Sequence, residues 1–343
     1  MPHTSLRMFV AVLFMAATCF CAQSRAETVL RMNHQFPATA AGAKIDAWFA
    51  EEVERSTGGE IKIKIFWAGA LGGPKENLAL LSAGAIDMAA MSAGYYPSEL
   101  PLHAAPNSMP MAMDNIHQAA AIMRALTDEI PAYEQEASRH GIKSLFFHIL
   151  NPYYLFSSEP VTSFDDLEGM KIRTWGEYMP LLVKSAGAVP VTVFLPELYE
   201  NLQRGVIDAC PFSLDLAVAY NIHEVAPHVT EVVLWEGPSW GVWINRDTWG
   251  RISKENREHI MDAAREAARR ELKAASGSET AARGRLIQEG VEFHDFPAAD
   301  LRKWKNNSPD FLELWTDRMA ERGLGESAEK TVELWRAIRD EMR

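Results

Sequence analysis

An arginine near the end of a predicted strand is the first residue that could do chemistry. The segment 170–174 is a predicted strand, and Arg173 lies near its carboxyl end, before a Thr-Trp-Gly loop. A guanidinium offers two parallel N–H donors that match the two oxygens of a carboxylate. A structural arginine paired with a nearby acidic side chain would show the same pattern. The sequence therefore predicts either an anion-binding position or an internal ion pair at Arg173.

Aromatic side chains are dense in the loops around this strand. The set comprises Tyr153, Tyr154, Trp175, Phe212, Trp235, Trp240 and Trp243. Most aromatic residues of any fold belong to its core, so the set alone does not define a site. Trp175 is favoured for binding because it follows Arg173 in the same loop. An apolar pocket with a few polar groups is the usual form of a small-molecule site.

Signals of catalysis are missing from the sequence. Cys210 precedes Pro211, but no Cys-His-Asn context accompanies it, and a buried structural cysteine is the simpler interpretation. The glycine-rich segment 71–73 lacks the Lys-Ser/Thr ending of a phosphate loop, and there is no nucleophile elbow or metal-ligand spacing. We therefore expect a binding protein that is not an enzyme and that holds no cofactor or metal.

The amino-terminal segment has the order of a secretory signal. An apolar run at 8–22 contains only Thr18 as a polar residue, and small residues stand at the −3 and −1 positions before a cleavage site after Ala26. The run is short for a membrane span of about 20 residues, although an uncleaved anchor is the alternative. We expect residues 1–26 to be removed and the protein to act in the periplasm.

Removal of this segment changes the charge of the chain. Residues 1–26 hold two basic and no acidic side chains, which leaves 32 Lys and Arg against 46 Asp and Glu and a net charge of −14. Such a chain is not expected to bind nucleic acid or anionic membranes through its bulk charge. Cys210 is then the single cysteine, so no intrachain disulfide is expected. The remaining 317 residues are enough for two domains.

The predicted elements form two groups of alternating strands and helices. The first group has strands at 29–32, 61–66 and 86–91 and helices at 41–56 and 75–82, which indicates an α/β domain with a largely parallel sheet. A helical stretch at 116–140, with Pro131 inside it, and a strand at 142–150 follow. The second group has strands at 170–174, 189–194 and 207–209 and helices at 178–186 and 198–204.

A crossover between two lobes is expected where the first group ends, at Asn151-Pro152. The segment 232–243 is expected to return to the first lobe, and 253–287 is predicted to be one long helix with Ser253 as its N-cap. We expect one lobe from 27–150 with about 236–275, a second lobe from 151–235 with about 276–343, and a hinge near 150–153 and 234–238.

Five sequence motifs, in their order along the chain, resemble those of a known protein family. They lie at 71–76, 80–88, 166–173, 196–199 and 202–209. Each motif alone is weak, but together, behind a signal segment, the series resembles the extracytoplasmic solute-binding proteins of tripartite ATP-independent periplasmic (TRAP) transporters. The resemblance implies a two-lobed periplasmic binding protein fold with a long helix that spans both lobes. It also implies a receptor that closes on a small organic acid and delivers it to the membrane permease subunits.

The resemblance assigns roles to several residues. Arg173 matches the arginine that binds the ligand carboxylate in this family, and His34 lies on the loop where relatives contribute a pocket contact. Tyr154 stands where many relatives have a second arginine, and Pro211 and Phe212 replace a frequent Glu-Asn pair. We therefore expect a monocarboxylate with an aromatic part or a hydroxy or oxo group. A C4-dicarboxylate, or an alignment shifted by one or two residues, is the alternative.

Two acidic residues complete the candidate site. Glu76, at a helix start, is either a ligand contact or a local cap, and Asp215 could face the cleft as a hydrogen-bond acceptor. We expect a monomer. A binding protein of an ATP-driven importer, a secreted enzyme and a ligand sensor for a membrane kinase are the competing functions.

Overall fold

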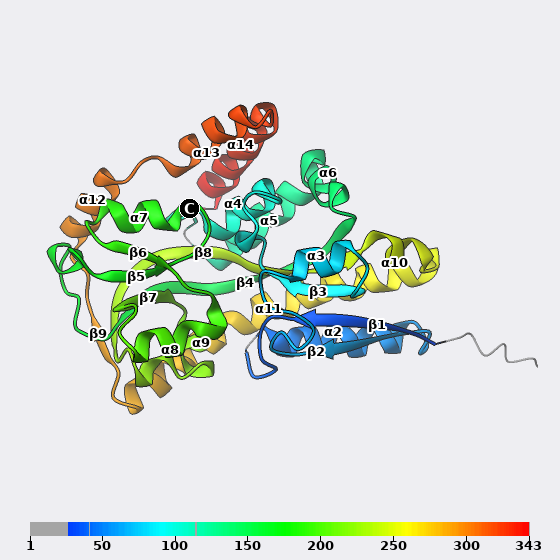
Figure 1. The fold of residues 1–343 in the computed structure, drawn as a ribbon, viewed down its shortest axis with the longest axis horizontal. Helices are drawn as coiled ribbons and strands as arrows, with labels where there is room; N and C mark the ends of the chain where they lie inside the picture. The colour runs from blue at the N-terminus through cyan, green and yellow to red at the C-terminus, as the bar shows by residue number, and fades with distance from the viewer. Residues whose placement is uncertain (1–26, 41, 114, 343) are drawn as a thin grey trace, which may run out of the picture.

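The computed structural model describes residues 27–40, 42–113 and 115–342 (Figure 1). The predicted signal segment lies outside the described residues. Within the described part of the chain, no helix is both long enough and apolar enough to cross a membrane.

The first lobe is built on three strands that pair in parallel. β1 pairs with β2 on one side and with β3 on the other. In β2, Ile61 and Ile63 are buried while Lys62 and Lys64 are exposed, the alternation expected of a strand with one face on the core. The elements are β1 (Thr28–His34), α2 (Ala43–Ser56), β2 (Ile61–Phe66), α3 (Asn77–Ser82) and β3 (Met88–Met91).

The second lobe repeats this plan at the other end of the molecule (Figure 1). β5 pairs in parallel with both β6 and β7. The elements are η2 (Asp165–Leu167), β5 (Lys171–Thr174), α7 (Met179–Ser185), β6 (Val189–Thr192), η3 (Leu195–Glu197), α8 (Leu198–Gln203), β7 (Ala209–Phe212), α9 (Leu214–Ala219) and η4 (Ile222–Glu224).

Two long antiparallel strands join the lobes into one sheet. β4 (Ile142–Ser157) and β8 (His228–Asn245) pair with each other, and the order is β2-β1-β3-β8-β4-β7-β5-β6, with β9 (Glu292–His294) also on β8. The expected end of the strand at Asn151 is wrong, because β4 continues to Ser157. The register shifts between Leu150 and Tyr153. Such an irregularity tolerates Pro152, which has no N–H to donate.

The predicted long helix is α11 (Lys254–Gln288), and the side chain of Ser253 caps it by accepting from the backbone N–H of Asn256. Its 35 residues extend about 52 Å at 1.5 Å per residue. α11 packs against α2 in the first lobe, β4 in the middle and α9 in the second lobe. This packing confirms the expected helix that spans both lobes.

The remaining helices cover the sheet. The helical stretch expected at 116–140 is split at Pro131, which begins a new helix because its fixed φ and missing N–H suit a first turn. The elements are η1 (Ala93–Tyr95), α4 (Pro101–Ser108), α5 (Ile116–Glu129), α6 (Pro131–Arg139), α10 (Arg246–Arg251), α12 (Ala298–Asn307), α13 (Phe311–Glu321) and α14 (Gly325–Glu341).

The last helix departs from the expected division of the chain. We expected 276–343 to lie with the second lobe, but α14 packs against α5. The indole of Trp335 is fully buried there and donates to the carbonyl of Ala112, and the amide of Gln118 donates to the carbonyl of Arg339. The apolar face of α14 thus completes the cover of helices beside the first lobe. The other lobe boundaries stay a prediction.

Candidate ligand-binding site

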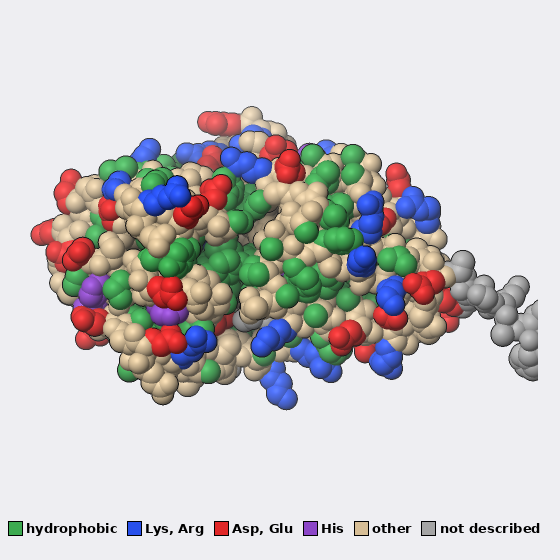
Figure 2. Space-filling view, turned by 60° about the horizontal axis from the view of Figure 1, so that its bottom comes forward, with side chains coloured by type: hydrophobic (Ala, Val, Ile, Leu, Met, Phe, Trp, Pro, Cys, Tyr) green, Lys and Arg blue, Asp and Glu red, His purple; other side chains and the backbone are tan. Residues whose placement is uncertain are grey.

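A hollow of about 310 Å³, including its open mouth, lies between the lobes. Its first-lobe residues follow β1 and β3 or belong to α4, its second-lobe residues lie at the end of β5 or follow β5 and β6, and the others belong to β4 and β8. The lining residues are Gln35, Phe36, Ser92, Tyr95, Asn107, Tyr153, Arg173, Trp175, Leu195, Trp235 and Ser239. The carboxyl ends of parallel strands are the usual place for ligands in open α/β sheets. Figure 2 shows hydrophobic side chains gathered near the middle of the molecule, between more highly charged ends.

Arg173 is a buried cation that has no acidic partner in the described part of the chain. Its side chain lies on the second lobe at the end of β5, and the residue is 4% exposed. Nε donates to the carbonyl oxygen of Val193 at 3.1 Å, and Nη1 donates to that of Pro211 at 3.4 Å. Within the described residues, no Asp or Glu forms an ion pair with it. The guanidinium therefore retains an uncompensated positive charge beside the hollow.

Aromatic rings surround this guanidinium. Its carbon lies 4.9 Å from the centroid of the Trp175 ring and 5.9 Å from that of Phe212. The Tyr153 ring packs edge-on against Trp175 at 5.7 Å and against Trp235 at 4.7 Å. Cation–π contacts fix the orientation of a guanidinium. The rings also exclude water, so the charge acts in a medium of low polarity where its attraction for an anion is strong.

The two lobes are in contact around the hollow. The indole N–H of Trp175, from the second lobe, donates to the carbonyl oxygen of Asn107 in the first lobe at 3.0 Å. Across the same gap the ring of Tyr95 packs edge-on against Phe194 at 4.9 Å. Burial raises the pKa of Tyr95, although the nearby charge of Arg173 opposes this effect. These contacts describe lobes closed on each other over the site.

Two buried polar atoms of lining residues have no hydrogen-bond partner among the described residues. One is the indole N–H of Trp235 and the other is Oδ1 of Asn107. Buried polar groups are normally hydrogen-bonded, and an unmade bond costs about 1–3 kcal/mol. A ligand with an acceptor and a donor beyond its carboxylate is one way to satisfy them.

The structure brings together three of the seven residues expected at the site. Arg173 and Trp175 line the hollow. Phe212 is not a lining residue but lies against the guanidinium of Arg173 in the layer beneath. Their roles in binding stay predictions.

Tyr154 is placed on the other side of the sheet. Its hydroxyl donates to Oε1 of Glu279 on α11 at 2.8 Å, and the neighbouring Tyr153 lines the hollow. Successive side chains of a strand point to opposite faces, so a shift of one residue exchanges the two tyrosines. This is the alternative register considered for the alignment. Two adjacent tyrosines give no sequence signal of which one faces the ligand.

His34 belongs to a buried ionic network, and the next residues, Gln35 and Phe36, line the hollow instead. Nε2 of His34 lies 2.7 Å from Oδ2 of Asp46. The ring of His148 lies between two carboxylates, with Nε2 at 2.8 Å from Asp46 and Nδ1 at 2.6 Å from Glu271 of α11. These partners raise the pKa of His148 to about 10 against the opposing effect of burial. The network connects α11 to the first lobe.

The two acidic candidates have local partners. Oε2 of the exposed Glu76 accepts from the backbone N–H of Gly73 at 2.7 Å, in the turn before α3, and this side chain does not cap the helix. Asp215 on α9 accepts from the hydroxyl of Ser278 on α11 at 3.4 Å. Neither lines the hollow.

Sequence reasoning missed all five first-lobe residues that line the hollow among the described residues. Gln35 and Ser92 directly follow parallel strands, and Tyr95 comes three residues after Ser92. The rule that ligands lie at the carboxyl ends of such strands could have found these three. Asn107, on α4, is brought in only by the tertiary packing of that helix.

Comparisons with known proteins agree with this architecture. Residues 33–317 match the DctP family, the bacterial extracellular solute-binding proteins of family 7. A solute-binding protein of Roseobacter denitrificans is 27% identical over 301 residues, which cover 86% of this chain and 90% of that protein.

Two solved structures share the fold. The Bordetella pertussis receptor DctP7, which binds pyroglutamic acid, has a TM-score of 0.82 at 20% identity and covers 90% of this chain and 99% of its own. A TRAP receptor of Sulfitobacter sp. with bound β-D-galacturonate has a TM-score of 0.79 at 21% identity and covers 90% and 100%. The family match over most of the chain confirms the resemblance found in the sequence, and the chain therefore belongs to the family 7 extracellular solute-binding proteins, which are receptors of TRAP transporters and not enzymes.

Proposed function

We propose that this receptor captures a small organic acid with one carboxylate, holds it through Arg173 between the lobes, and delivers it to a TRAP permease. The observation that carries the proposal is the buried guanidinium without an acidic partner among the described residues. An unpaired buried charge is costly. A ligand carboxylate compensates it with charge-assisted hydrogen bonds, which contribute about 1.5–3 kcal/mol net.

The composition of the hollow supports a monocarboxylate. Arg173 is the single Lys or Arg among the described residues that line it. A second carboxylate in this aromatic surrounding would have no cation, and its desolvation would cost several kcal/mol. Pyroglutamic acid and galacturonate, the ligands of the two solved relatives, are both monocarboxylic acids with further hydrogen-bonding groups. The unpartnered atoms of Trp235 and Asn107 fit a ligand of that kind.

The lining of the hollow restricts the ligand further. Besides Arg173, it offers aromatic rings and hydrogen-bonding side chains such as Ser92 and Ser239. This lining favours an acid such as a hydroxy acid, an oxo acid or a single-ring acid. Burial of the apolar part of such a ligand against the aromatic walls contributes a binding free energy of about 25 cal/mol per Å² of apolar surface.

We expect the receptor to act in the periplasm after cleavage behind Ala26, as is the norm for its family.

A thermal-shift screen of refolded protein, freed of co-purified ligand, tests the proposal. The panel should contain single-ring monoacids, hydroxy acids, 2-oxo acids and C4-dicarboxylates. Ligand at 100 times its Kd stabilises the folded state by about 2.7 kcal/mol, so hits raise the melting temperature. Hits among monoacids support the proposal. Hits confined to dicarboxylates, confirmed by calorimetry, would refute the monocarboxylate assignment and require a second cation at the site.

A further inference from the structure

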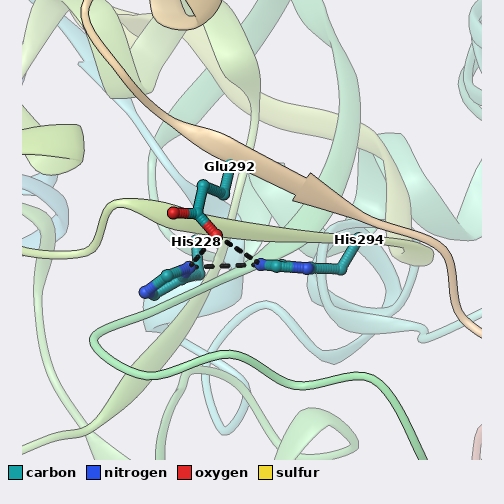
Figure 3. A group of neighbouring side chains, drawn as sticks. All are labelled: His228, Glu292 and His294. Atoms are coloured by element: carbon teal, nitrogen blue, oxygen red, sulfur yellow. Dashed lines mark hydrogen bonds and ion pairs between the residues drawn. The ribbon is translucent and has the colours of Figure 1, made fainter.

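We propose that His228, Glu292 and His294 form a binding site for a divalent transition-metal ion such as Zn²⁺ on the second lobe. His228 begins β8, and the other two residues lie on β9. β9 pairs in parallel with β8, with His228 opposite Glu292 and Thr230 opposite His294. Because Glu292 and His294 are two residues apart on one strand, they share a face of the sheet with His228. Figure 3 shows the three side chains converging on one point.

The distances between the three ligand atoms fit a metal ion. Nδ1 of His228 lies 3.1 Å from Nε2 of His294, and Oε2 of Glu292 lies 3.7 Å from the first and 4.0 Å from the second. The point in the plane of these three atoms that is equidistant from them lies about 2.1 Å from each, and zinc binds imidazole nitrogen at about 2.0–2.1 Å and carboxylate oxygen at about 2.0–2.2 Å. Three protein ligands leave a fourth position for water.

The donor set also selects the class of ion. Two imidazoles and one carboxylate suit zinc and the neighbouring divalent transition metals, whereas calcium and magnesium prefer oxygen ligands alone. The histidine side chains are 15% and 17% exposed and are held by the paired strands, and that of Glu292 is 66% exposed. The histidines are therefore pre-positioned, and the carboxylate is free to complete the coordination.

The arginine that contacts β9 lies on the opposite face of the sheet from the three ligand residues. The guanidinium of Arg283 lies 4.6 Å from the ring of Phe293, and it pairs with Glu231 at 2.7 Å. Phe293 stands between Glu292 and His294 on β9, so its side chain points to the opposite face of the sheet. The net charge of −14 for residues 27–343 also favours the approach of a cation.

A bound ion would brace one particular connection in the fold. β9 follows α11 directly, and β8 is one of the two strands that cross between the lobes. Bonds from one metal to both strands would fix the carboxyl end of α11 to the second lobe. The ion would thus stabilise the folded receptor without touching the ligand hollow, since none of its three residues lines that hollow.

Titration of the untagged, chelator-treated protein with ZnCl₂ tests the site by calorimetry, and CoCl₂ gives an independent signal through the visible absorption of the bound ion. We expect one ion per chain. H228A and H294A should weaken binding at least 10-fold, while H117A, which removes an exposed histidine from α5, should leave it unchanged. Glu292→Gln should also weaken it.

Three controls separate the outcomes. Circular dichroism in EDTA must show that each variant is folded. Ligand affinity at the hollow should be the same in H294A and the unmodified protein, so failure of this proposal leaves the proposed function untouched. Absence of zinc binding at 100 µM metal, or binding that H228A and H294A leave intact, would overturn the proposal.

Discussion

Removal of the guanidinium of Arg173 is the sharpest test of the ligand site. The structure gives this side chain two hydrogen bonds to backbone carbonyls and no ion pair among the described residues. Loss of one charge-assisted bond to a ligand carboxylate costs about 1.5–3 kcal/mol. Because about 1.4 kcal/mol is a tenfold change in Kd, Arg173→Ala should weaken binding about 10- to 100-fold or more.

The lysine variant separates charge from geometry. Arg173→Lys keeps a positive charge but replaces the planar fork with a point charge, so we expect it to bind more weakly than the unmodified protein and more tightly than Arg173→Ala. The alanine variant leaves the carbonyls of Val193 and Pro211 without this donor. The loss of about 1 kcal/mol for each hydrogen bond should not unfold the receptor.

Isothermal calorimetry with a monoacid from the screen is the assay, and circular dichroism must show native structure for each variant. Arg265→Ala is the matched control, because that arginine is on the surface of α11, with a side chain 62% exposed, and pairs with Asp262. A folded Arg173→Ala protein that retained native affinity would refute the site assignment.

Three further predictions concern motion, stability and pH. Saturating ligand should lower the radius of gyration of the ligand-free protein in small-angle scattering, and an unchanged radius from a demonstrably open apo form would contradict a hinge at 150–153 and 234–238. Asp46→Asn should destabilise the fold by about 3–5 kcal/mol in urea titrations, because it removes the buried carboxylate that His34 and His148 share, whereas the exposed Asp262→Asn should change little. The pKa of His148 is raised from 6.5 to about 10 in the folded state, so its contribution to stability is complete below about pH 6.5 and is lost as the pH rises through 10. His148→Gln should be less stable at pH 7 and should lack this decline, and an identical decline in both proteins would show that another group causes it.

Much of the fold could be predicted from local patterns. The alternation in 61–66 fixed a strand with one buried face, and Ser253 located the first turn of α11. The break expected at Asn151 was wrong. A proline is incompatible with a regular strand but is compatible with a strand whose pairing register shifts. The strand that pairs with this shifted register, β8, lies far away in the sequence, so the local pattern does not indicate it.

The site was harder to predict than the fold. Arg173 and Trp175 could be predicted as site residues because both lie at the carboxyl end of one short strand, β5. Asn107 reaches the hollow only through the tertiary packing of α4, and no spacing in the sequence indicates that packing. His34 was predicted to belong to the site because it lies on a loop after the first strand. Its burial against Asp46 depends on the packing of α2, which the loop position does not indicate.

Among the described residues, β4, β8 and α11 are long elements that extend from one lobe to the other. The buried network that includes Glu271 connects α11 to the first lobe. The carboxyl end of α11 continues directly into β9, which pairs with the second-lobe end of β8. A helix secured at both ends cannot lengthen, so the lobes cannot simply draw apart. We therefore expect opening to be a swing about an axis near these three elements, which would present the receptor to a permease in a narrow range of orientations.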